Sequence, residues 1–132
     1  MIDQILTAVK ALATLHAAPF TSIEHGATPA GEGIAIYPGP GFPTDVHFDR
    51  GTTYSVPFVL NGKHDDLGVL LPAMSNIHKA LSQMTEYPKT DDWQILSIES
   101  ATPPNYVSRE VSEPQSWLYG SILSVRFYIK GV

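Results

Sequence analysis

The chain has 132 residues, of which 43% are hydrophobic, 10% aromatic and 16% charged, which excludes a disordered chain and suits a single domain, residues 1–132. Thirteen acidic side chains against eight basic ones give a net charge of −5, which argues against a partner held mainly through phosphates, such as nucleic acid. The absence of cysteine excludes disulfides, thiolate metal sites and cysteine nucleophiles. The N-terminus lacks the basic region of a signal peptide and no apolar run approaches a membrane span of about 20 residues, so neither feature is expected.

The first residues have the spacing of an amphipathic helix. Apolar side chains recur at helical intervals from Ile2 to Ala13, with polar side chains on the other side. The helix is expected to end by Ala18, because the residue before a proline is pushed out of the α region. Frequent prolines and glycines then predict repeated turns around one short strand, 34–37, and an exposed loop from about 38 to 48.

A strand followed by a helix is predicted in the middle of the chain. Alternate residues from Thr52 to Leu60 share one face, and Pro57 on the other face suggests a sheet edge or a bulge. Asn61-Gly62 is typical of a turn, and Asp65 or Asp66 can cap a helix with apolar spacing from Leu67 to Met84. Because of Pro72, this helix either begins late enough to place the proline in its first turn or is kinked there.

The last third of the chain is predicted to be sheet. It contains strands at 93–100 and 106–111, turns at 103–105 and 113–115, and a long closing strand. In the closing strand the expected buried face carries Tyr119, Leu123, Val125, Phe127 and Ile129. The predicted order is α-β-β-α-β-β-β, which indicates an α+β domain with two helices packed on a mainly antiparallel sheet.

Two polar clusters could carry chemistry. Asp45, His47 and Asp49 alternate along the chain and would share one face of an extended segment, where a metal could bind if the chain curved. The favoured interpretation is a polar strand or loop edge; the alternative is a small metal-dependent hydrolase built on these three residues. His64, Asp65 and Asp66 stand at a predicted helix start, where capping and the helix dipole favour acids. No catalytic, cofactor-binding or metal-binding residue is therefore assigned, and the remaining histidines are expected to be non-catalytic.

The aromatic side chains divide into core and candidate interface. Core positions are expected for Tyr54, Phe58, Trp93, Tyr119 and Phe127. A large ring in or beside a turn either folds back on its domain or meets another chain. The candidate interface residues are Phe42, Phe48, Arg50 and Trp117. Residues 26–44 carry one charged side chain, Glu32, so the region from about 26 to 50 is the first place to look for a contact with another chain.

Several short sequence segments follow one another in a characteristic order along nearly the whole chain. They are the N-terminal helix at 2–15, the strand and helix from Tyr54 to Leu81, and the sequences Trp93-Gln94-Ile95, Pro103-Pro104-Asn105-Tyr106-Val107 and Trp117-Leu118-Tyr119. In this pattern the chain resembles the tail terminator proteins of long-tailed bacteriophages, in the group also labelled phage minor capsid proteins. The resemblance rests on pattern and order and includes no catalytic motif.

The resemblance implies a structural virion protein, not an enzyme. Such proteins assemble in the host cytoplasm as a ring, typically of six subunits, on the head-proximal end of the tail tube. The ring stops tube polymerisation and provides the surface that joins the filled head. The implied partners are other copies of the chain, the major tail tube protein and a head-closure or neck connector protein. DNA passes through the ring without specific binding, which an acidic balance suits because like charges repel phosphate. No cofactor and no membrane are implied.

Two further functions stay open at this point. One is a neighbouring neck component, such as a tail completion or head-closure protein, which would share partners but bind on the portal side. The other is a small-ligand-binding α+β domain that uses a sheet face as its pocket.

Overall fold

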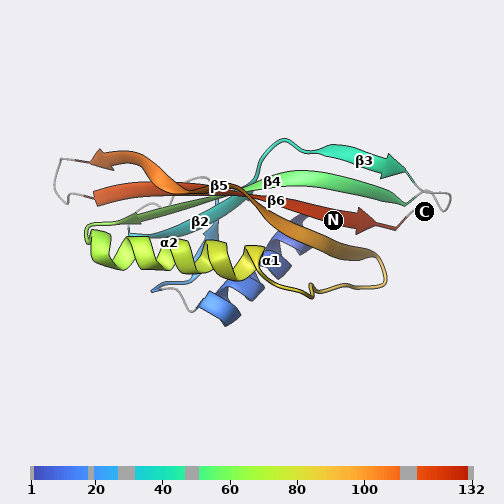
Figure 1. Ribbon diagram of the computed structural model, residues 1–132, viewed down its shortest axis with the longest axis horizontal. Helices are drawn as coiled ribbons and strands as arrows, with labels where there is room; N and C mark the ends of the chain where they lie inside the picture. Colours follow the sequence, from blue (N-terminus) through green and yellow to red (C-terminus); the bar gives the residue numbers. More distant parts are fainter. Residues whose placement is uncertain (1, 18–19, 27–31, 47–50, 111–115, 131–132) are drawn as a thin grey trace.

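Two helices lie against one face of a sheet in the computed structural model, which describes residues 2–17, 20–26, 32–46, 51–110 and 116–130 (Figure 1). The element order is α1 (Ile2–Ala17), β1 (Ile23–His25), β2 (Gly33–Pro38), β3 (Phe42–Val46), β4 (Thr52–His64), α2 (Leu67–Ser82), β5 (Trp93–Glu110) and β6 (Ser116–Ile129). The predicted α+β class is confirmed. More strands precede α2 than the sequence predicted, and fewer follow it.

Within the described residues the sheet has six strands, and its main path runs β1-β2-β4-β6-β5. β1 pairs in parallel with β2, and the other neighbours are antiparallel. β4 and β6 form the centre, paired from Thr52 opposite Ile129 to His64 opposite Trp117. β2 and β3 follow one another along the other side of β4, separated by residues 39–41. The prediction of a loop from 38 to 48 is therefore wrong for residues 42–46, which pair with β4.

Pro57 lies inside β4, although β4 is a central strand. Its partner in β6 is Ser124, and its carbonyl oxygen accepts a hydrogen bond from the N–H of Gly39 at 2.6 Å. The N–H and C=O positions of one residue point to the same side of a strand, so the donor that proline lacks would face the interruption between β2 and β3. Pro57 thus marks a local break in the neighbouring strand and not an edge of the sheet.

The core lies between the helices and the facing side of the sheet. The alternation predicted for β4 and β6 is confirmed, since Val56, Phe58 and Leu60 are buried with Leu123, Val125 and Phe127. α2 packs over β4, β5 and β6, and α1 packs against α2 and β2. The helices contribute buried residues at helical spacing: Ile5, Leu6, Val9 and Ala13 from α1, and Leu70, Ala73, Met74, Ile77 and Leu81 from α2.

The predicted turn at Asn61-Gly62 is wrong, because β4 continues through it to His64. A Cβ atom added to Gly62 would lie 2.6 Å from Sδ of Met74 and 2.8 Å from Cδ1 of Leu70. Such separations are closer than van der Waals contact. Glycine is needed at this position because α2 crosses close above the strand.

Asp66 caps α2, as the sequence predicted. Its backbone is extended, and its Oδ1 accepts a hydrogen bond from the N–H of Gly68 at 2.9 Å. The helix begins at Leu67, so the alternative that places Pro72 in the first turn is wrong. Pro72 lies inside the helix on its exposed side, and its ring nitrogen cannot donate to the carbonyl of Gly68.

The predicted turn at residues 103–105 is also wrong, because β5 runs unbroken from Trp93 to Glu110. Two prolines are accepted there since β5 pairs with β6 on one side and is an edge of the sheet. Register shifts at several points along the β5–β6 pair absorb the irregular backbone. The predicted turn at 113–115 lies outside the described residues. The start of β6 and the end of β5 therefore lie together at one end of the molecule, opposite the end where β4 begins (Figure 1).

Candidate interaction surfaces

Four side chains near the paired end of β5 and β6 form a cluster that we call the aromatic arm: Tyr106, Arg109, Trp117 and Tyr119. The ring of Tyr106 meets Trp117 edge-on at 6.2 Å between centroids and Tyr119 at 6.0 Å. The guanidinium carbon of Arg109 lies 4.5 Å from the centroid of the Trp117 ring, within cation–π range. Tyr106 is 55% exposed, whereas Trp117 and Tyr119 are partly buried against the core.

The aromatic arm has the composition of a protein-binding surface. Trp, Tyr and Arg are the residue types that contribute most of the binding free energy in measured interfaces. The sequence singled out Trp117, and the structure places it in this cluster. It missed Tyr106 and Arg109, because their contact with Trp117 follows from the register of β5 on β6, in which Tyr106 pairs with Tyr119 and Arg109 with Trp117.

The other candidate interface residues stay predictions. The backbone of Phe42, in β3, pairs with Ser55 of β4, but the side chain of Phe42 lies outside the described part of the chain. Phe48 and Arg50 also lie outside it. The structure does not test the alternative metal cluster of Asp45, His47 and Asp49 either. The side chain of Asp45 and the whole of His47 and Asp49 lie outside the described residues.

An apolar hollow of about 350 Å³ lies on the core side of the sheet, near the start of β4 and the end of β6. Its walls are Ile2, Pro38, Gly39, Gly41, Tyr54, Val56, Phe127 and Ile129. Tyr54 and Phe127 stack with 5.7 Å between ring centroids and 26° between ring planes. A Cβ on Gly41 would lie 2.4 Å from Cγ2 of Val56, so glycine lets this loop lie directly on β4.

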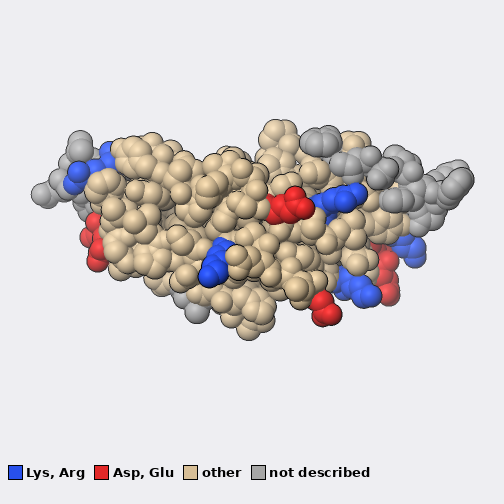
Figure 2. Space-filling view, viewed as in Figure 1, with Lys and Arg blue, Asp and Glu red and all other residues tan. Residues whose placement is uncertain are grey.

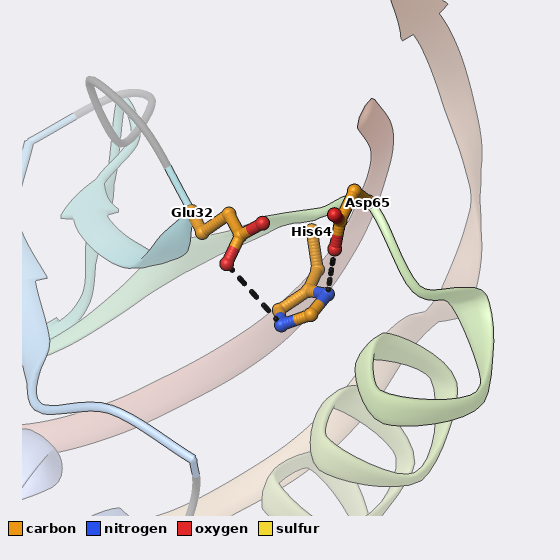
Figure 3. Close-up of side chains that lie close together, drawn as sticks. All are labelled: Glu32, His64 and Asp65. Carbon is orange, nitrogen blue, oxygen red and sulfur yellow. Dashed lines mark ion pairs between the residues drawn. The ribbon is translucent and has the colours of Figure 1, made fainter. Parts of the chain in front are cut away.

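His64 lies between two carboxylates at the junction of β4 and α2 (Figure 3). Its Nε2 is 3.4 Å from Oε2 of Glu32, and its Nδ1 is 3.0 Å from Oδ1 of Asp65. Nδ1 also accepts a hydrogen bond from the N–H of Asp66 at 2.9 Å. The ring of Phe20 meets the imidazole edge-on at 5.0 Å.

This arrangement fits a structural link better than a metal centre. Glu32, His64 and Asp65 each offer a ligand atom within 4.8 Å of the others. However, the carboxylates lie at different ring nitrogens, and Nδ1 already accepts a backbone N–H, so the ligand atoms do not converge on one point. The cluster ties the start of β2 to the cap of α2. Sequence reasoning missed Glu32 because it reaches His64 through the pairing of Gly33 with Lys63.

His78 joins α2 to β5 inside the molecule. Its side chain is buried, and Nε2 lies 2.7 Å from Oγ of Ser100. No residue in the described part of the chain hydrogen-bonds to Nδ1. Burial lowers the pKa of His78, because removal from water disfavours the imidazolium form. The neutral ring therefore serves as a packed, hydrogen-bonded contact between the helix and the strand.

Charged side chains are sparse over much of the molecular surface. On the face shown in Figure 2, a few separate Lys, Arg, Asp and Glu side chains lie among other residues across the middle of the molecule and towards both ends. Among the described residues, no helix has the length and apolar character needed to cross a membrane.

The sequence matches no protein-family model. It also has no significant match among curated proteins. Among solved structures, the fold is similar to a chain of the virion of a native gene transfer agent (GTA) particle. The alignment has a TM-score of 0.56 and 16% sequence identity, and it covers 98% of this chain and 92% of that chain. The two chains share a fold.

Proposed function

We propose that this protein is a structural component of a phage-like virion, and that its position there is the head-proximal end of the tail. The observation that carries the proposal is the fold similarity to a virion chain over nearly the full length of both chains. The resemblance of the sequence to tail terminator proteins supports the finer assignment. In this role the protein caps the tail tube as a ring, stops polymerisation and presents a surface to the head; no catalytic step is needed.

The surface chemistry supports a protein that works by contact with other proteins. The aromatic arm and the apolar hollow are two different patches on one subunit, which is what a ring of identical copies requires. Charged side chains are scattered and few on the face shown in Figure 2. The net charge of −5 suits a ring through which DNA passes, because like charges repel phosphate. A basic lining of the assembled channel would contradict this last point.

The proposal is tested by adding the purified protein to the major tail tube protein of the same particle during polymerisation. The expected result is shorter tubes, with the protein recovered on tubes pulled down through a tag on the tail protein. Tubes of unchanged length that retain none of this protein would refute the terminator role. Recovery instead with the portal-side connector alone would favour a head-closure or tail completion protein.

A matched pair of variants separates the loss of the aromatic arm from a general effect of truncating a side chain. Trp117→Ala removes the centre of the aromatic arm, and Leu15→Ala truncates a side chain that is 76% exposed on α1. We expect Trp117→Ala to reduce capping and Leu15→Ala to leave it unchanged. Circular dichroism spectra and thermal melts verify that both variants fold.

A further inference from the structure

We propose that His64 and its neighbours form a pH-dependent switch at the start of α2 (Figure 3). In one state, a neutral imidazole accepts the backbone N–H of Asp66 at Nδ1. In the other state, an imidazolium donates from Nδ1 to the carboxylate of Asp65 and releases that N–H. The switch goes beyond the proposed function and does not depend on it.

Two contacts at Nδ1 of His64 require opposite protonation states of this nitrogen. The backbone nitrogen of Asp66 lies 2.9 Å from Nδ1, and Oδ1 of Asp65 lies 3.0 Å from it. A bare Nδ1 accepts the N–H of Asp66, but its lone pair then faces a carboxylate oxygen. A protonated Nδ1 donates to Asp65, but its hydrogen then faces the N–H of Asp66. The ring nitrogen therefore satisfies only one of the two neighbours at a time.

The other ring nitrogen decides which neutral form is present. Nε2 of His64 lies 3.4 Å from Oε2 of Glu32, and an ionised carboxylate offers only acceptors. A neutral imidazole has one hydrogen, and the carboxylate beside Nε2 favours placing it there. Nδ1 is then bare and available to the N–H of Asp66. Protonation adds a hydrogen to Nδ1 and leaves the contact with Glu32 in place, so the change is confined to the Nδ1 side.

Solvent reaches the parts of the cluster that must change. The side chain of His64 is 15% exposed, whereas those of Glu32 and Asp65 are 50% and 56% exposed. The ring of Phe20 packs edge-on against the imidazole at 5.0 Å between centroids, and Trp117 lies opposite His64 in the neighbouring strand. The packed imidazole therefore keeps its position when the proton is added, and the exposed carboxylate of Asp65 moves.

Among the described residues, the other charged groups on the surrounding elements do not compete for Nδ1. The side chain of Lys63 points to the opposite face of β4, because successive side chains alternate along a strand. The guanidinium of Arg109 in β5 lies against the Trp117 ring. The carboxylate of Asp66 accepts the N–H of Gly68, and the first turn of α2 contains no acidic side chain. The positive end of the α2 dipole opposes an imidazolium nearby, which the two carboxylates of the cluster offset.

The released group belongs to the residue that caps α2. The side chain of Asp66 caps the helix, and its backbone N–H is the group that the imidazole holds or releases. Protonation therefore loosens the entry into α2 while it draws Asp65 onto the ring. It also adds one positive charge next to Trp117 of the aromatic arm, which pairs with His64 between β4 and β6.

NMR of the intact chain tests the switch from about pH 8 to about pH 5, the range in which an imidazole changes charge. At the alkaline end, the nitrogen resonances of His64 should show a bare Nδ1 and a protonated Nε2. As the imidazole gains its second proton, the amide of Asp66 should lose protection against hydrogen exchange, after correction for the intrinsic exchange rate. The expected loss is about 2- to 12-fold, the range that one hydrogen bond contributes.

Asp65→Asn provides a second test through urea unfolding. The variant removes the charge that pairs with the imidazolium, so its cost in urea midpoint should be larger at the acidic end of the range than at the alkaline end. A capping or dipole effect of Asp65 alone would cost the same at both ends. The matched control is Asp91→Asn, at an exposed carboxylate before β5, which should shift the midpoint equally at both ends. The contribution of His78 is common to all three proteins and cancels.

Three results would overturn the switch. The first is a hydrogen on Nδ1 of His64 at the alkaline end, and the second is an Asp66 amide whose protection stays constant while the imidazole titrates. The third is an equal cost of Asp65→Asn at both ends of the pH range. None of these measurements involves tail tubes, so failure of the switch leaves the proposed function standing, and failure of tube capping leaves the switch standing.

Discussion

Gly62→Ala tests the packing of α2 on the sheet. The new Cβ would lie 2.6 Å from Sδ of Met74 and 2.8 Å from Cδ1 of Leu70, and both of these side chains are fully buried. They must move to make room, and overpacking of this kind costs about 1–3 kcal/mol. Unfolding entropies near 2.1 cal/mol/K per residue give about 0.28 kcal/mol/K for a chain of this length, so Tm should fall by about 4–11 °C.

The assay is thermal unfolding followed by circular dichroism, with urea unfolding as a second measure. The control is Gly68→Ala at an exposed position in the first turn of α2, whose Cβ would lie 3.2 Å from Oδ1 of Asp66. Alanine is more favourable than glycine in a helix, so the Tm of this variant should not fall. Adding Met74→Ala to Gly62→Ala should cost less than the sum of the two single changes. An unchanged Tm for Gly62→Ala, or full additivity with Met74→Ala, would refute close packing of α2 at this glycine.

Three further predictions concern stability. Pro72→Ala should stabilise the protein by about 1–3 kcal/mol, because it restores a donor inside α2, and a Tm that does not rise would contradict the helix as described. Asp66→Ala should cost about 0.5–2 kcal/mol in urea unfolding through loss of the cap to Gly68, whereas Asp66→Asn should retain most of the stability. The pKa of His78 is lowered in the folded state, so below pH 6.5 the unfolded chain binds a proton that the folded chain does not. Stability should therefore fall as the pH drops below about 6.5 towards the folded-state pKa, and His78→Gln should reduce this slope; equal slopes in the two proteins would count against a buried neutral imidazole.

The elements with strong periodicity could be predicted from the sequence. Alternation in β4 and β6 identified the core residues around Phe58 and Phe127, and apolar spacing identified both helices. The wrong predictions concern glycine and proline residues, which occur in turns but also have other structural roles. Asn-Gly is typical of a turn, but Gly62 is needed for the approach of α2. The prolines at 103–104 are typical of a turn, but an edge strand accepts them.

The candidate surfaces depend on tertiary structure and could be predicted only in part. Trp117 stood out as a large ring beside a turn, while Tyr106 and Arg109 join it through strand register. The hollow is lined by residues of α1, of the segment between β2 and β3, of β4 and of β6. Its position depends on how these elements pack, which the spacing of residues within each element does not give.

Electron microscopy of tube ends tests the central claim most directly. Tubes of the major tail protein are assembled with this protein, and the two ends of individual tubes are compared in class averages. We expect a ring of extra density, with the rotational symmetry of the tube, at one end and no further growth from that end. Two identical bare ends that continue to elongate would contradict the assignment of this protein as the tail terminator.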